Sequence, residues 1–106
     1  MIDLNYEKNI TFIADHYGET EQLIQTAEEC DELGHAVLRY RRALIDGNTS
    51  AETLRKAQEA VIEEIADALI MAEQLIYLEG AQGDVEKMIS IKLARQVERI
   101  KAVSGE

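Results

Sequence analysis

Residues 61–80 read VIEEIADALIMAEQLIYLEG, a largely apolar stretch with two acidic residues near its start and a glycine at its end. Its Ala, Leu, Ile and Met residues favour a helix, and glycine is common just beyond a helix end. Apolar side chains from Ile65 to Leu78 cover nearly every direction around the axis, as in a helix with neighbours on several sides. Asp67 lies among them. Since a carboxylate between apolar neighbours is costly to bury unless it is paired or binds metal, Asp67 is a candidate functional residue.

Turn and capping signals divide the chain into four predicted helices. Asp3 can cap the first helix, Gly18 can end it, and residues 46–48 (Asp-Gly-Asn) form a turn signal. Thr49, followed three residues later by Glu52, fits a capping box at the start of the third helix. The first expected helix runs from its cap at residue 3 to about residue 17, and the second begins near residues 19–21 and precedes the turn at residues 46–48. The third begins at residue 49 and continues to about residue 79, and the fourth runs from about residue 84 to residue 103.

Composition supports an all-α class and one domain, residues 1–106. The chain has 106 residues and contains no proline and no tryptophan, and it is rich in helix formers. We expect a four-helix bundle whose two long central helices carry the acidic motifs. Because the third helix needs more cover than three short partners give, we also expect oligomerisation, to a homodimer or homotetramer.

The apolar positions predict which helix faces turn inward. On the second helix this stripe leaves Glu28, Glu29 and Glu32 on its flank and back. The stripe consists of Leu23, Ala27, Cys30, Gly34, Val37, Leu38, Arg41 and Leu44. On the fourth helix the predicted inward positions are Val85, Met88, Ile89, Leu93, Val97 and Ile100.

Charge and cysteine content exclude several function classes. The net charge of -10 repels nucleic acid polymers and anionic lipid surfaces, so neither is an expected partner. Cys30 is the only cysteine, which rules out an internal disulfide. Residues 1–5 lack the basic stretch and apolar core of a signal peptide, and no apolar run is long enough to span a membrane. A cytoplasmic location is the expectation.

Two pairs of acids predict a metal site. Glu29 and Glu32 stand three residues apart, and so do Glu64 and Asp67, so each pair projects from one helix face. Two pairs on adjacent helices would form a four-carboxylate cage, whose oxygens suit Mg²⁺ or Mn²⁺. The alternative is a solvated acidic face, which is common where 30% of residues are charged.

A di-iron site is a rival interpretation. Glu32 and His35 have the Glu-x-x-His spacing of di-iron carboxylate bundles, which need that element twice. The second acidic cluster offers no histidine, so an oxidase is disfavoured and His35 is interpreted as a surface or hydrogen-bonding residue.

Basic residues cluster at two places. Lys92, Arg95 and Arg99 form one strip on the fourth helix, where they either complement the helix dipole or bind phosphate. The spacing of these residues does not distinguish between the two interpretations. Residues 39–42, which include Arg39, Arg41 and Arg42, are interpreted as the basic end of the second helix.

The acidic motifs resemble those of the MazG-like, all-α nucleoside triphosphate pyrophosphohydrolases. Residues 28–32 (EECDE) and 63–67 (EEIAD) are similar to the Glu-Glu-x-x-Glu and Glu-x-x-Asp motifs of that superfamily. Tyr17-Gly18 and Gln22 ahead of the first motif, together with residues 92–99, resemble its short stand-alone members. The likeness covers most of the chain.

This resemblance implies hydrolysis of a nucleoside triphosphate to the monophosphate and pyrophosphate, with Mg²⁺ required and Mn²⁺ as a substitute. The implied metal ligands are Glu29, Glu32, Glu64 and Asp67. The expected catalytic residues are Glu28 and Glu29, with Glu28 as proton acceptor, and the expected substrate-binding residues are Gln22, Lys92, Arg95 and Arg99. The base pocket is left open among Tyr6, Phe12, Tyr17 and Gln22. The alternative function is a non-catalytic helical homo-oligomer that binds metal, nucleotide or a protein partner.

Overall fold

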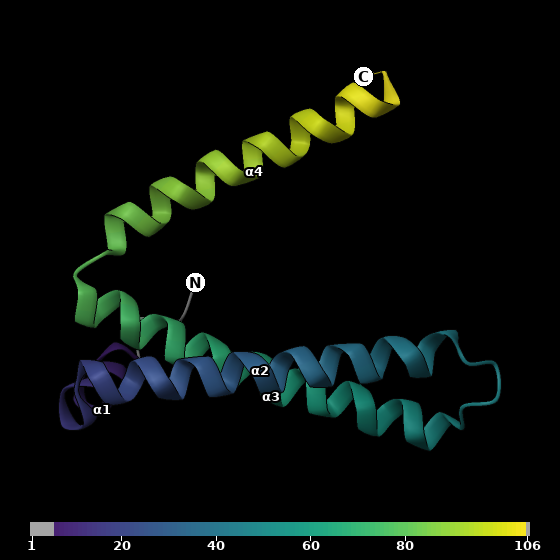
Figure 1. Cartoon of the computed structure of the whole chain (residues 1–106), viewed down its shortest axis with the longest axis horizontal. Helices are drawn as coiled ribbons and strands as arrows, with labels where there is room; N and C mark the ends of the chain where they lie inside the picture. Colours follow the sequence, from purple (N-terminus) through teal and green to yellow (C-terminus); the bar gives the residue numbers. More distant parts are fainter. Residues whose placement is uncertain (1–5, 106) are drawn as a thin grey trace.

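The computed structural model describes residues 6–105, which form helices and turns without any strand. Four helices follow one another: α1 (Glu7–Tyr17), α2 (Glu19–Ile45), α3 (Ala51–Glu79) and α4 (Gln82–Ser104) (Figure 1). The all-α class and the four predicted helices are therefore confirmed. The expected cap at Asp3 lies outside the described residues. Across residues 6–105, no helix is both long and apolar enough to cross a membrane.

Helices α2 and α3 form an antiparallel pair that is the main contact of the chain (Figure 1). Ser50 caps the start of α3, and its Oγ accepts a hydrogen bond of 3.1 Å from the Thr53 N–H. The predicted capping box at Thr49 and Glu52 was wrong by one residue. With Ser50 as the cap, the third position of the helix is Thr53, so Glu52 cannot complete a box.

The seam between α2 and α3 is lined by small and polar side chains as well as apolar ones. On α2 the buried and half-buried residues recur three and four positions apart, a spacing typical of helices packed side by side. They are Gln22, Thr26, Glu29, Leu33, Ala36, Tyr40 and Ala43, and Gly34 of the predicted stripe is half-buried beside them. The predicted stripe was wrong for α2, since Leu23, Val37, Leu38 and Leu44 are exposed. The face of α2 that meets α3 is thus a less apolar one, and it includes Glu29.

A buried amide pair ties α2 to α3. The Gln22 Nε2 donates a hydrogen bond of 2.6 Å to the Gln74 Oε1, and both residues are buried. The α1 helix packs mainly on α3, where Ile10 and Ala14 are buried. The Tyr77 hydroxyl lies 2.9 Å from both carboxylate oxygens of Asp15 and donates a hydrogen bond to this carboxylate, which links α3 to α1.

The α4 helix extends away from the other three, and within residues 6–105 it contacts only α3, beside the connection between them (Figure 1). Gly80, at φ +60°, ends α3 in the left-handed conformation that favours glycine. The Gly80 and Ala81 N–H groups bond the carbonyls of Tyr77 and Ile76, which is the Schellman arrangement. Two residues therefore turn the chain into α4.

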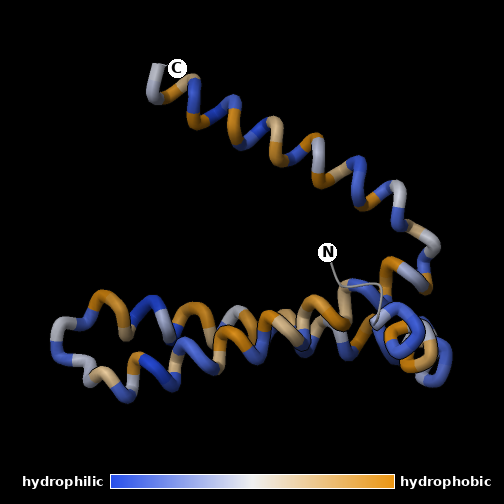
Figure 2. Tube along the Cα trace, turned by 180° about the vertical axis from the view of Figure 1, so that it is seen from behind, coloured by the Kyte–Doolittle hydropathy of each residue, from blue (hydrophilic) through white to orange (hydrophobic). Residues whose placement is uncertain are grey.

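The apolar positions of α4 predicted to face inward are exposed in this chain, apart from the half-buried Val85. Figure 2 shows hydrophobic residues recurring along the whole of α4, and beyond its first turns this helix has no neighbour among residues 6–105. The radius of gyration is 17.4 Å, compared with about 13 Å for a compact domain of 100 residues. A single chain thus leaves α4 without the cover that its sequence pattern calls for.

Candidate metal centre

Three carboxylates from two helices meet in the seam between α2 and α3. Glu29 comes from α2, while Glu64 and Asp67 come from successive turns of α3. One oxygen from each of the three residues lies within 4.8 Å of the others. All three residues are half-buried. We call this set the acid trio.

Two oxygens of the acid trio lack a hydrogen-bond partner. Glu29 Oε1 accepts a hydrogen bond of 2.9 Å from Gln25 Nε2. Its Oε2, like the Oε2 of Glu64, is shielded from solvent and has no partner among the described residues. Buried polar atoms are nearly always paired, so two carboxylate oxygens without a partner among residues 6–105 make this place a candidate cation site.

Burial and the neighbouring negative charges raise the pKa of Glu64 above its usual value. Burial is the largest cause, and the negative charges of Glu32, Asp67, Glu29 and Glu63 add to it in that order. Both causes disfavour the ionised carboxylate, whereas a bound cation would favour it. Without a cation, the acid trio is therefore a source of electrostatic repulsion.

Glu32, the fourth predicted ligand, lies beside the acid trio and not within it. The seam passes through Glu29 and Leu33, so Glu32 is at its edge and is exposed. Its charge still raises the pKa of Glu64. The structure thus brings three of the four expected carboxylates together and keeps the fourth within electrostatic reach.

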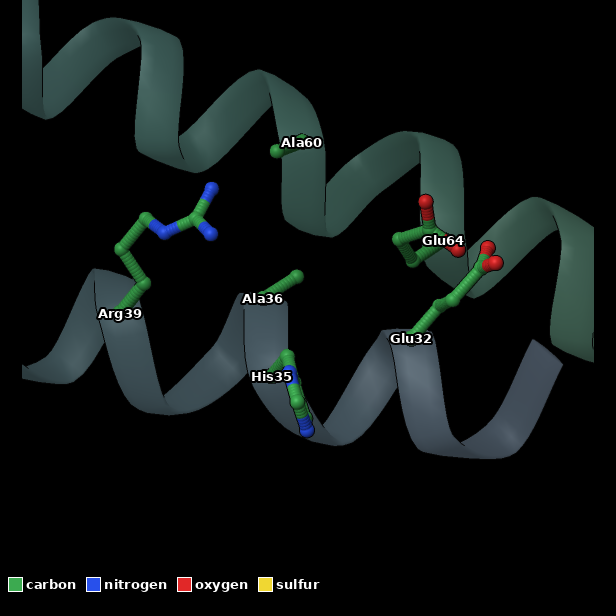
Figure 3. Close-up of a pocket in the computed structure, with 6 residues that line it drawn as sticks. All are labelled: Glu32, His35, Ala36, Arg39, Ala60 and Glu64. Atoms are coloured by element: carbon green, nitrogen blue, oxygen red, sulfur yellow. The ribbon is translucent and has the colours of Figure 1, made fainter. Parts of the chain in front are cut away.

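A groove of about 270 Å³ opens beside the acid trio. It is lined by Glu32, His35, Ala36 and Arg39 from α2 and by Ala60 and Glu64 from α3. Figure 3 shows the Arg39 side chain extended toward α3, whereas the ring of His35 is turned away from that helix. His35 is exposed, as predicted.

Arg39 lines this groove but was not predicted from the sequence as a site residue. It was interpreted as part of the basic end of α2, together with Arg41 and Arg42. The signal was available in its position, because Arg39 follows Glu32 by seven residues and so returns to the same helix face.

The remaining predicted site residues lie elsewhere. Glu28 is exposed on α2, outside the acid trio. Gln22 is buried in the seam against Gln74. The basic strip of Lys92, Arg95 and Arg99 is exposed on α4, and α4 makes no contact with α2 within the described range. One chain by itself does not bring the strip to the acid trio.

Comparisons with protein-family models, with curated proteins and with solved structures found no match. The resemblance to the MazG-like superfamily therefore remains a prediction based on the acidic motifs.

The donor chemistry of the acid trio fits a hard divalent cation. Its donors are carboxylate oxygens, which Mg²⁺ and Mn²⁺ prefer over the thiolate and imidazole ligands of softer metals. Two of these oxygens are already shielded from solvent, without a hydrogen-bond partner in the part of the chain that the structure describes. The adjoining groove leaves room on one side, so a cation held here would keep access to a second ligand.

Proposed function

We propose that this protein is a Mg²⁺-dependent nucleoside triphosphate pyrophosphohydrolase that acts on ribo- or deoxynucleoside triphosphates. Water would attack the α-phosphorus, and the bond from that phosphorus to the α,β-bridging oxygen would break, giving the monophosphate and pyrophosphate. The observation that carries the proposal is the acid trio, two of whose oxygens are shielded from solvent and find no partner in residues 6–105. The motif resemblance supplies the reaction class.

Each acidic residue has a proposed role. Glu29, Glu64 and Asp67 would hold Mg²⁺, with Mn²⁺ as a substitute, and Glu32 is the fourth proposed ligand. A Mg²⁺ ion bound there supplies Lewis acidity and neutralises phosphate charge. Glu28, which is exposed next to Glu29, would accept the proton of the attacking water.

A second copy of the chain is the proposed partner of α4. Residues 1–81 contain 17 acidic and six basic residues, whereas α4 contains three acidic and five basic ones. The exposed apolar row of α4 thus sits on a basic helix, while α1 to α3 offer exposed apolar residues on an acidic body. This complementarity favours a homodimer or homotetramer in which α4 packs on another chain.

Such an assembly offers a role for the basic strip. Lys92, Arg95 and Arg99 flank the apolar row of α4 at helical spacing. If α4 packs against the acidic body of another chain, these residues come closer to the acid trio of that chain. The acid trio of their own chain lies too far from them. We assign them to the β- and γ-phosphates of the substrate across the subunit boundary.

Product analysis tests the proposed reaction. Purified protein is incubated with a panel of ribo- and deoxynucleoside triphosphates and Mg²⁺, and the products are separated by ion-exchange chromatography. Monophosphate and pyrophosphate are expected in equal amounts, with no turnover in excess EDTA. Release of orthophosphate alone, or no turnover of any triphosphate, would contradict the proposal.

Variants separate loss of chemistry from loss of fold. Glu64→Gln and Asp67→Asn should abolish turnover while their far-ultraviolet circular dichroism stays that of a helical protein. Asp31→Asn is the matched control, because Asp31 is an exposed acid of α2 outside the acid trio. It should keep wild-type turnover.

The exposed apolar row of α4 favours one alternative, a non-catalytic homo-oligomer that binds metal, nucleotide or protein through its helices. In that case Mg²⁺ or nucleotide would raise the melting temperature by binding the folded state, but no product would form. Turnover therefore discriminates between the two functions, whereas stabilisation does not.

A further inference from the structure

The groove beside the acid trio carries negative charge at one end and positive charge at the other. Glu32 and Glu64 line it where it adjoins the acid trio, and Arg39 lines it further along α2. Seven residues separate Glu32 from Arg39, which corresponds to about 10 Å along the helix axis. The groove thus presents two oppositely charged binding regions in one line.

Small residues hold the groove open between these regions. Ala36 of α2 is buried, and Ala60 of α3 lines the same depression. Figure 3 shows both alanines between Arg39 and the two glutamates, with the Arg39 side chain rising from α2 toward α3. The two methyl groups are small and form no hydrogen bonds. They therefore leave the guanidinium accessible from the acid trio along the groove.

Arg39 has no ion-pair partner within residues 6–105, so its guanidinium can bind an external anion. The ion pairs found among residues 6–105 are Arg55 with Glu59 and Lys56 with Glu52, and neither involves Arg39. Glu32 and Glu64 line the same groove as Arg39, but neither carboxylate lies within ion-pair distance of the Arg39 guanidinium. A planar guanidinium donates paired hydrogen bonds to two oxygens of one phosphate, which an ammonium group does not.

A ligand that binds both a cation at the acid trio and the Arg39 guanidinium needs several anionic groups along one chain. Anionic oxygens at one end would complete the shell of a cation held by the acid trio, and a second anionic group would reach Arg39. A single phosphate ion cannot occupy both regions at once. A polyphosphate chain has the required repetition of charge.

We propose that Arg39 is a substrate-binding residue of this site, which grips a phosphate of the triphosphate or pyrophosphate chain while another phosphate lies at the cation of the acid trio. This inference rests on the proposed function and adds to it a basic residue from the same chain. Under it, a single subunit binds a metal–polyphosphate complex before any partner subunit contributes Lys92, Arg95 or Arg99.

Arg41 provides a matched control. It has the same side chain on the same helix, is also exposed, and lies two residues on, which turns it about 200° away from Arg39 around the axis. Arg39→Gln and Arg41→Gln therefore change the net charge equally, but only the first alters the groove. Arg39→Lys keeps the charge and removes the planar donor pair.

Isothermal titration with inorganic pyrophosphate in the presence of Mn²⁺ tests the inference. Arg39→Gln should weaken pyrophosphate binding about tenfold or more, and Arg39→Lys should give a smaller loss. Arg41→Gln should bind as the wild type does. Titration with Mn²⁺ alone should be the same in all four proteins, because the acid trio is intact.

Two results would overturn the inference: equal pyrophosphate affinity in Arg39→Gln and Arg41→Gln, or no pyrophosphate binding by the Mn²⁺-loaded wild type. Neither depends on catalysis. If the wild type binds pyrophosphate through Arg39 but hydrolyses no triphosphate, the proposed reaction fails and the anion site stands. If it hydrolyses triphosphates and Arg39→Gln binds pyrophosphate normally, the reaction stands and the role of Arg39 fails.

Discussion

Glu29 of α2 and Glu64 of α3 each keep one carboxylate oxygen shielded from solvent and without a hydrogen-bond partner in the described part of the chain. The two helices therefore pack in a way that brings like charges together, although exposed positions lie one residue away on either side of Glu29. Such an arrangement destabilises the metal-free fold, and a divalent cation at the acid trio would remove the repulsion.

Divalent cations should stabilise the folded protein. At a free concentration about 100 times the dissociation constant, binding to the folded state alone adds about 2.7 kcal/mol to the free energy of unfolding. Differential scanning fluorimetry with Mg²⁺ and Mn²⁺ should show the rise in melting temperature. Glu64→Gln should lose most of this response, and Asp31→Asn should keep it. An equal response in both variants would place the cation elsewhere.

The buried pair of Gln22 and Gln74 should contribute to stability as a unit. Gln74→Leu leaves the Gln22 amide buried without its partner, and this should cost about 1–3 kcal/mol of unfolding free energy in urea titrations. The Gln22→Leu/Gln74→Leu double variant should lose less than the sum of the two single variants, because no amide is then orphaned. Strict additivity would mean that the hydrogen bond of 2.6 Å does not couple the two residues.

The pair of Glu79 and Glu19 should make stability depend on pH. A hydrogen bond with the Glu19 carboxylate is the main cause that raises the pKa of Glu79, followed by charge repulsion and burial. Between the unfolded pKa near 4.5 and the raised folded pKa, the folded state holds more protons than the unfolded state. This contribution to stability is therefore complete at low pH and is lost as pH rises through the folded pKa.

Either Glu79→Gln or Glu19→Gln should remove this contribution, since the effect needs both carboxyl groups. Melting temperatures measured by circular dichroism from pH 4 to pH 7, without divalent metal, should fall more steeply with rising pH in the wild type than in either variant. Parallel curves for the three proteins would show that the two carboxyl groups do not interact in solution.

The exposed row of α4 should hold the proposed assembly together. Leu93→Asp places a charge in this row and should convert the oligomer to monomer in sedimentation velocity runs at micromolar concentration. Ala102→Asp is the control, because nine residues further on the side chain points to the opposite side of the helix. A wild type that sediments as a monomer, or two variants that behave alike, would refute this interface.

Much of the fold could be predicted from the sequence because local signals determine helix ends. Gly18, Gly80 and the turn at residues 46–48 all end helices where expected. The facing of the helices was harder to predict. Leu23 and Leu38 made one face of α2 look internal, but α3 packs on a neighbouring face that includes Ala36. Apolar periodicity identifies a face that needs cover, and it does not say whether the same chain covers it.

The candidate site was predicted in part for a similar reason. Spacing of three residues placed Glu64 and Asp67 on one face of α3, and the structure joins Glu29 to them. The same spacing could not show that Glu32 lies at the edge of the seam, because the packing angle between helices decides it. Arg39 was overlooked, since a basic residue near a helix C-terminus already has an explanation in the helix dipole.

Anomalous scattering from a crystal grown with Mn²⁺ is the most direct test of whether the acid trio is a metal centre. A metal centre there should give a strong Mn²⁺ peak between α2 and α3, about 2.0–2.3 Å from oxygens of Glu29, Glu64 and Asp67. A crystal in which these three carboxylates point apart into solvent, with any Mn²⁺ bound at other residues, would contradict it.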